Sequence, residues 1–117
     1  SAACPNSRLI LHAHPPKLLA LSLSVEESRL LNLPLPEAER YRAALAVVPF
    51  FPPGGEALAY AVSEAAKGCP AVWMQRHGLV VHSEDAATVL GLSEELEQLA
   101  GIQLASLSAE ARQAGAH

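Results

Sequence analysis

The sequence predicts an α/β domain, because short apolar runs of strand length alternate with longer segments of helical character. The strand signal is carried by residues 8–14, 46–49 and 71–77, and residues 79–81 are expected to continue the last strand after Gly78. An alanine-rich segment and a leucine-bearing C-terminal segment carry the helical signal. With 117 residues, the chain is long enough for one domain.

The N-terminal part is predicted to run from a loop over residues 1–7 through the first strand into a helix over residues 17–24. Pro15 and Pro16 precede this helix. They are tolerated there because the first N–H groups of a helix have no partner within the helix.

The following segment, residues 24–33, can be interpreted in two ways. Ser24 and Glu27 have the spacing of a capping box, which favours a helix, but two prolines follow and end it. A short helix is then expected over residues 37–45, directly before the strand 46–49.

Two helices are predicted in the second half. The first begins at Gly55-Glu56 and ends near Lys67, with Gly68 as the residue after its C-terminus. The second is expected to be capped by Ser83, with Glu84 and Asp85 in its first turn. Its expected apolar side consists of six residues, Leu90, Leu92, Leu96, Leu99, Ile102 and Leu107.

Composition narrows the possible partners. Half of the residues are hydrophobic but only 4% are aromatic, so the core must consist mainly of Ala, Leu and Val, with Trp73 and Met74 buried in a strand. The net charge is −4 and the basic residues do not cluster, which argues against nucleic acid as the main partner. No apolar run approaches the roughly 20 residues of a membrane span, and the first residues do not have the charged and then apolar pattern expected of a signal peptide.

Cysteine usage predicts a reducing, cytoplasmic location. Cys4 and Cys69 are far apart and fit no Cys-x-x-Cys pattern, so both are interpreted as free thiols. A single disulfide between them stays open as the alternative.

Two histidines at the end of the first strand are the main functional signal. Side chains two residues apart on a strand project to the same side, so His12 and His14 are expected to face one space, with Pro15 ending the strand beyond them. Neutral imidazoles held side by side are suitable ligands for zinc(II).

His77 is the candidate third ligand, because it ends the run 71–77 and is followed by Gly78. Glycine allows a close backbone approach or a positive φ. Three histidines at strand ends suit a catalytic zinc site, in which one coordination position stays open. The alternative is a partly buried His77 that is hydrogen-bonded to backbone.

Other chemically active residues are weaker candidates. His82 is expected on the opposite face of the strand from His77, and His117 is terminal. Arg76 is a candidate phosphate contact or a structural ion pair. The acids considered as a general base are Glu26, Glu27 and Glu56, although Glu56 is explained by its place at a helix N-terminus.

Together these motifs resemble the class II aldolase/adducin family over residues 8–112. The resemblance rests on Leu11-His12-Ala13-His14-Pro15, on residues 52–58 and on Arg76-His77-Gly78-Leu79-Val80-Val81. It continues through residues 83–87 into the helix that carries Glu94, Glu95, Leu96 and Glu97.

The resemblance implies an α/β/α sandwich with a mostly antiparallel sheet, assembled as a homotetramer. It implies zinc or another divalent transition metal bound by His12, His14 and His77. The implied function is a sugar-phosphate aldolase, a lyase that cleaves a ketose 1-phosphate through a metal-stabilised enediolate. The alternatives are an epimerase or dehydratase of the same family, a catalytically silent adducin-like interaction module, or a small zinc-stabilised domain.

The resemblance also implies a catalytic residue that this chain does not supply. In the family, the catalytic glutamate and the Ser/Thr/Gly-rich phosphate loops precede the His-x-His motif, and the matching glutamate is expected upstream of Ser1. The catalytic residue is therefore unassigned. Residues 1–117 are expected to form an incomplete domain, either truncated or naturally half-length.

The chain departs from the family pattern at three further points. Arg76 stands where many members have Asn, and Gly55 stands where Ser is common. Neither Tyr41 nor Tyr60 matches the C-terminal tyrosine of some aldolases.

Overall fold

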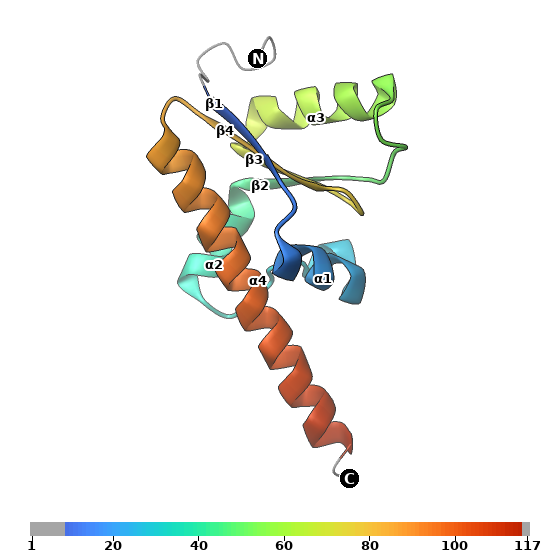
Figure 1. Ribbon diagram of the computed structural model, residues 1–117. Helices are drawn as coiled ribbons and strands as arrows, with labels where there is room; N and C mark the ends of the chain where they lie inside the picture. Colours follow the sequence, from blue (N-terminus) through green and yellow to red (C-terminus); the bar gives the residue numbers. More distant parts are fainter. Residues whose placement is uncertain (1–8, 116–117) are drawn as a thin grey trace.

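The computed structural model describes residues 9–115 and confirms the predicted α/β fold (Figure 1). Its four-stranded sheet has the order β1 (Leu9–Ala13), β4 (Gly78–Ser83), β3 (Ala71–Met74) and β2 (Leu45–Val48). The β1–β4 and β3–β4 pairs are antiparallel, and the β2–β3 pair is parallel. The sheet is therefore mostly antiparallel, as the family resemblance implies.

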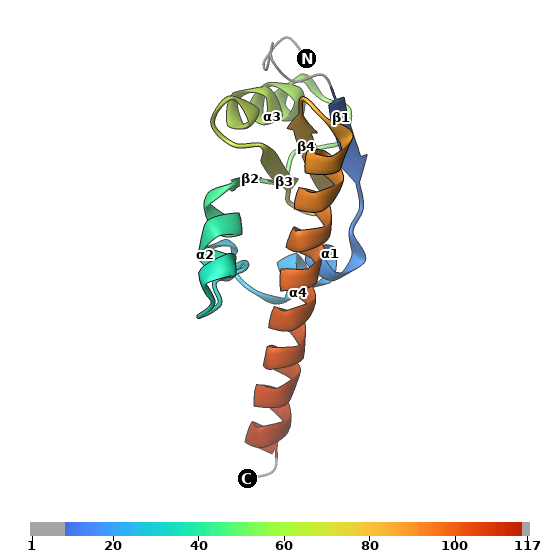
Figure 2. The same cartoon turned by 90° about the vertical axis from the view of Figure 1, so that its left-hand side faces the viewer.

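Helices cover both faces of this sheet, as the two perpendicular views show (Figures 1 and 2). One face carries α3 (Glu56–Gly68), which packs on β2 and β3. The other face carries α1 (Pro16–Ser24), α2 (Pro36–Ala43) and the long α4 (Ala86–Gly115). A 3₁₀ turn, η1 (Glu27–Arg29), lies between α1 and α2.

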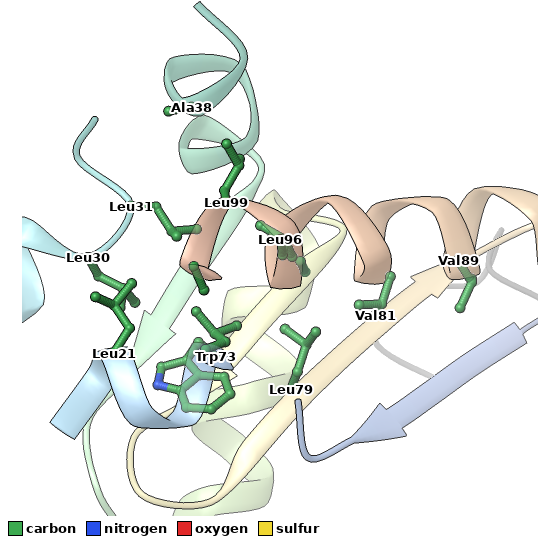
Figure 3. Close-up of a cluster of buried hydrophobic side chains, with 13 residues drawn as sticks. Leu21, Leu30, Leu31, Ala38, Trp73, Leu79, Val81, Val89, Leu96 and Leu99 are labelled. Atoms are coloured by element: carbon green, nitrogen blue, oxygen red, sulfur yellow. The ribbon is translucent and has the colours of Figure 1, made fainter. Parts of the chain in front are cut away.

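The larger core lies between the sheet and α4 (Figure 3). Trp73 is fully buried there, as predicted, and packs with Leu79 and Val81 of the neighbouring strand. Met74, also predicted to be buried, belongs to the smaller cluster beneath α3. Successive strand residues point to opposite faces, which is why these two neighbours contribute to different cores.

A polar side chain of α4 fixes the connection between α1 and α2. Gln103 is buried, and its Oε1 accepts a hydrogen bond from the Leu31 amide (2.7 Å) while its Nε2 donates to the Arg29 carbonyl (2.8 Å). Leu31 has a positive φ of 59°, so these bonds hold an unfavourable backbone conformation in place. The capping box considered at Ser24 does not form, because the Ser24 hydroxyl donates back to the Ala20 carbonyl.

The prediction for residues 71–81 was wrong in one respect. The strand expected over 71–77 ends at Met74, and residues 79–81 belong to a second, antiparallel strand that begins at Gly78. Met74 pairs directly with Gly78, so residues 75–77 form the turn of a hairpin. The turn is hard to detect from sequence because its left-handed residue is Arg76, with φ 61°, rather than Gly or Asn.

Helix boundaries also differ from the prediction. Ser83 ends β4 and does not cap α4. Asp85 has that role, since its carboxylate accepts hydrogen bonds from the Thr88 amide (2.7 Å) and hydroxyl (3.0 Å). Gly68 is the last residue of α3 and is followed by an extended Cys69. Leu45, expected at the end of a helix, begins β2.

The predicted apolar side of α4 is only partly confirmed. Leu96 and Leu99 are buried, but Leu90 and Ile102 are 52% and 42% exposed. Val89 and Ala100 are buried in their place. The predicted residues do not all lie on one side of the helix, because only large apolar side chains were included and the smaller Val89 and Ala100 were left out.

Some sequence-based expectations lie outside the described residues, namely the loop over 1–7, which includes Ser1, and the position of His117. The catalytic glutamate expected upstream of Ser1 therefore stays a prediction. Cys69 forms no disulfide among the described residues, and Cys4 lies outside them, so the pairing of Cys4 with Cys69 stays untested. Within residues 9–115, no helix combines the length and the apolar character needed to cross a membrane.

The Asp85 cap generates a prediction for pH-dependent stability. Hydrogen bonds from Thr88 lower the pKa of Asp85. The ionised carboxylate therefore contributes to the free energy of unfolding at neutral pH, and this contribution is lost as the pH falls through the lowered pKa. Asp85→Ala should therefore lower the thermal midpoint at pH 7, and the difference from wild type should shrink in acid. Glu84→Gln removes a neighbouring exposed acid and should leave the midpoint unchanged. A difference that persists below the pKa would contradict this account.

Candidate metal centre

The three predicted ligands come from two adjacent strands. His12 lies within β1 and is paired with Val80 of β4. His14 is the first residue after the end of β1. His77 lies in the turn just before β4, next to Gly78. The antiparallel pairing of β1 with β4 brings the end of one strand to the beginning of the other, so the three imidazoles converge.

The convergence is close enough for one metal ion. The ring centroid of His12 is 4.9 Å from that of His14 and 5.2 Å from that of His77, and the His14–His77 distance is 6.0 Å. One ligand atom from each lies within 4.8 Å of the others. Nitrogen ligands on a tetrahedral zinc are about 3.3 Å apart, because each Zn–N bond is about 2.0 Å. The three imidazoles would therefore have to move closer together, by up to about 1.5 Å between nitrogens, to coordinate one zinc ion.

Gly78 allows this approach because it has no side chain. A Cβ at this position would lie 2.7 Å from the Ala13 carbonyl oxygen, 3.1 Å from His14 Cδ2 and 3.3 Å from His12 Nε2. The sequence indicated that Gly78 allows either a close backbone approach or a positive φ, and the structure shows the close approach. Within residues 9–115, Gly54 is the glycine with a positive φ.

The electrostatics of the cluster favour a neutral imidazole at His12. Partial desolvation lowers the pKa of His12, and electrostatic repulsion by His14 and His77 lowers it further. A neutral ring is the form that donates a lone pair to a metal. Within residues 9–115, Nδ1 of His77 is a buried side-chain nitrogen that has no hydrogen-bond partner. Three clustered imidazoles with an unpaired buried nitrogen fit the donor set of a zinc site.

The turn that carries His77 is held by several contacts. The amide of Gln75 donates to the Val48 carbonyl, and the amide of His77 donates to the Met74 carbonyl, both at 3.0 Å. Arg76 is exposed, and its guanidinium lies 5.5 Å above the centre of the Phe50 ring. These contacts fix the backbone on both sides of Arg76 and thereby place His77.

The remaining sequence candidates lie outside the cluster. Nε2 of His82 is 3.0 Å from the carbonyl oxygens of Ala66 and Cys69, so His82 attaches the end of α3 to β4. Glu56 is the first residue of α3, Glu26 precedes η1 and Glu27 lies in it. Glu27 shares a surface cleft with Arg76 and Phe50.

Glu97 makes contacts that its sequence pattern does not indicate. Its carboxylate accepts hydrogen bonds from the backbone amides of Lys17 (3.0 Å) and Leu18 (2.9 Å) at the beginning of α1. Glu94, Glu97 and His14 line the same cavity. The partners are about 80 positions apart in the chain, and no local sequence pattern could reveal the contact.

Comparison with known proteins identifies the family of the chain. Residues 2–104 match the family described as Class II Aldolase and Adducin N-terminal domain. The chain belongs to this family. No match was found among curated proteins.

Solved structures show the same fold. A sugar-phosphate aldolase from Thermotoga maritima is 32% identical, with a TM-score of 0.76 over 90% of this chain and 47% of that one. L-fuculose-1-phosphate aldolase from Thermus thermophilus is 28% identical, with a TM-score of 0.69 over 90% of this chain and 56% of that one. A putative aldolase/epimerase/decarboxylase, YgbL from Klebsiella pneumoniae, is 28% identical, with a TM-score of 0.67 over 84% and 48%. The chain thus spans about half the length of these proteins.

The close approach at Gly78 can be tested by adding one methyl group. Gly78→Ala should destabilise the protein by roughly 1–3 kcal/mol, because the new Cβ meets a backbone carbonyl that cannot move alone. Gly91→Ala is the matched control, since a Cβ there has nothing within 4 Å and replaces glycine inside α4. It should be neutral or stabilising by about 0.5–1 kcal/mol. Equal effects of both substitutions in urea denaturation would contradict the proposed clash.

Proposed function

We propose that the chain is the metal-binding part of a sugar-phosphate aldolase, a lyase acting on a ketose 1-phosphate. The observation that supports this most directly is the convergence of His12, His14 and His77 in a member of the class II aldolase family. We further propose that the three imidazoles hold zinc or another divalent transition metal. The similar protein described as a sugar-phosphate aldolase supports the substrate class.

In this proposal the protein supplies a fixed, partly open set of ligands. A divalent metal, when bound, supplies a positive charge that stabilises negative charge on substrate oxygens. His12 and His14 are exposed and His77 is half-buried, so the cluster can be reached from solvent. β1 and the hairpin turn hold the ligands in place, which limits the reorganisation needed on binding.

Arg76 is the proposed substrate-binding residue. Its backbone is adjacent to His77, and its guanidinium is exposed beside a cleft also lined by Ser22 and Gln75. A guanidinium presents paired N–H donors that match two oxygens of a phosphate. The contact with Phe50 holds the side chain on this surface and limits the entropy lost on binding.

The acid/base catalyst is not assigned to a residue of this chain. Within residues 9–115, no carboxylate belongs to the cluster of potential ligands, and Glu26, Glu27 and Glu56 lie on other elements. Proton transfer by a positioned acid or base contributes about 10²–10⁴-fold to a rate. We therefore propose that residues 1–117 hold the metal and contribute to substrate binding, and that a segment upstream of Ser1 or another chain completes the site.

We also propose a homo-oligomer, in the form of a tetramer, in a reducing cytoplasm. β1 is an edge strand in the described sheet, and its Leu9 and Ile10 are 40% and 55% exposed. Apolar side chains on an unprotected strand edge favour association. Cys69 forms no disulfide within residues 9–115, which is compatible with a reducing compartment.

Metal binding is the first test. Protein that has been stripped with a chelator and reloaded should contain about one equivalent of zinc, as expected for one cluster of three imidazoles. His12→Ala and His77→Ala should lose most of it, and His82→Gln should retain it, since His82 bonds to the carbonyls of Ala66 and Cys69. Equal zinc content in wild type and in the triple alanine variant of the cluster would rule out the site.

Catalysis is the second test. The zinc-loaded chain alone should release dihydroxyacetone phosphate from ketose 1-phosphates slowly, because within residues 9–115 no carboxylate belongs to the cluster of potential metal ligands. A coupled assay measures this release, with the His12→Ala variant as the background. Rapid turnover that depends on His12 would place the acid or base within this chain. Glu94, which lines the cavity beside His14, would then be the first residue to replace.

A further inference from the structure

The beginning of α1 lacks the usual means of capping. Pro15 occupies the N-cap position and has no side-chain acceptor, and Pro16 follows as the first helical residue without an N–H group. The first hydrogen bond within the helix runs from the Leu19 amide to the Pro15 carbonyl (3.0 Å). Two N–H groups therefore need an acceptor from elsewhere, those of Lys17 and Leu18.

Glu97 accepts both of these N–H groups. Its Oε2 is 3.0 Å from the Lys17 nitrogen, and its Oε1 is 2.9 Å from the Leu18 nitrogen. A carboxylate with two backbone donors forms stronger hydrogen bonds than neutral groups do, and its negative charge is favourable at a helix N-terminus. Because Glu97 belongs to α4, this pair of bonds attaches the beginning of α1 to the longest helix of the domain.

The segment between this attachment and the proposed metal site is short and stiff. His14 is followed directly by Pro15, whose φ is −65°, and by Pro16. Proline rings allow little variation of φ, and Pro15 is also buried. A displacement of the Lys17 amide is therefore transmitted to the His14 backbone. On its other side, His14 lies against the position of Gly78.

We propose that Glu97 is a positioning residue for His14, which holds this ligand in register with His12 and His77. This inference rests on the proposed metal site. Glu97 acts through the backbone of α1 and does not contact the metal. Loss of the carboxylate frees the His14-Pro15-Pro16 segment to move relative to β4, and the three nitrogens then no longer share one centre.

Two simpler explanations must be separated from this one. Glu97 could contribute only to global stability, as Gln103 does further along α4 through its bonds to Arg29 and Leu31. Alternatively, its negative charge could act on the cluster without any hydrogen bond. Glu94 is exposed, lies on the same helix and lines the same cavity, so it tests the second explanation.

The experiment titrates the apo 117-residue chain with Co²⁺, whose visible absorption reports ligand geometry, and measures zinc affinity by competition with a chromophoric chelator. Glu97→Gln should weaken zinc binding by about tenfold and should alter the Co²⁺ spectrum. Loss of a group that orients a metal ligand typically weakens metal binding by about 10–100-fold, and the lower value is expected here because Glu97 acts through the backbone. Glu94→Gln should leave affinity and spectrum as in wild type. Gln103→Ala should lower the thermal midpoint and leave metal binding unchanged.

The outcomes distinguish failure of this inference from failure of the proposed function. Wild-type affinity and an unaltered Co²⁺ spectrum in Glu97→Gln would overturn the positioning role and leave the metal site intact. Equal losses in Glu97→Gln and Glu94→Gln would also overturn it, in favour of a charge effect. A wild-type chain that binds neither metal would overturn both proposals. If Glu97→Gln does not fold, Glu97→Asp, which retains a shorter carboxylate, should show the same weakened affinity and altered spectrum.

Discussion

The pairing of β1 with β4 is the contact on which the candidate metal centre depends. At the end of this pair the Ala13 carbonyl approaches so closely that residue 78 has no room for a Cβ. The same contact places His12 and His14 beside the turn that carries His77. A larger residue at position 78 would push β1 away from β4, and it would thereby also move His12 and His14 away from His77.

The hydrophobic core fixes the register of this pairing. Leu11 is paired with Val81, and both contribute to the core beneath α4. Because side chains alternate along a strand, burial of Leu11 directs His12 to the opposite face of the sheet. A shift of one residue would expose Leu11 and bury His12, so core formation and ligand orientation depend on the same register.

The sequence predicted the features that local periodicity controls. Parity along a strand placed His12 and His14 on one side and identified Trp73 and Met74 as core residues. It did not reveal the hairpin turn, because Arg76 adopts a left-handed conformation that Gly or Asn would normally signal. The sequence also could not identify the contact of Glu97 with α1 or that of Gln103 with the connection between α1 and α2, since these contacts join residues more than 70 positions apart. Local patterns therefore predicted the three candidate ligands, whereas tertiary contacts determine how His14 and His77 are held.

Arg76 shows how local strain relates to the proposed site. A left-handed conformation costs a non-glycine residue about 1–2 kcal/mol, and Asn is tolerated there better than Arg. The guanidinium contact with Phe50 recovers about 0.5–1 kcal/mol at an exposed position, and hydrogen bonds on either side of Arg76 hold the turn. Asn would adopt this turn conformation at a lower energetic cost than Arg, and Asn is the residue that the family resemblance leads us to expect at position 76. The strain of Arg76 is therefore better explained by what its guanidinium presents at the cleft that Ser22 and Phe50 also line, which agrees with its proposed role in binding a phosphate group.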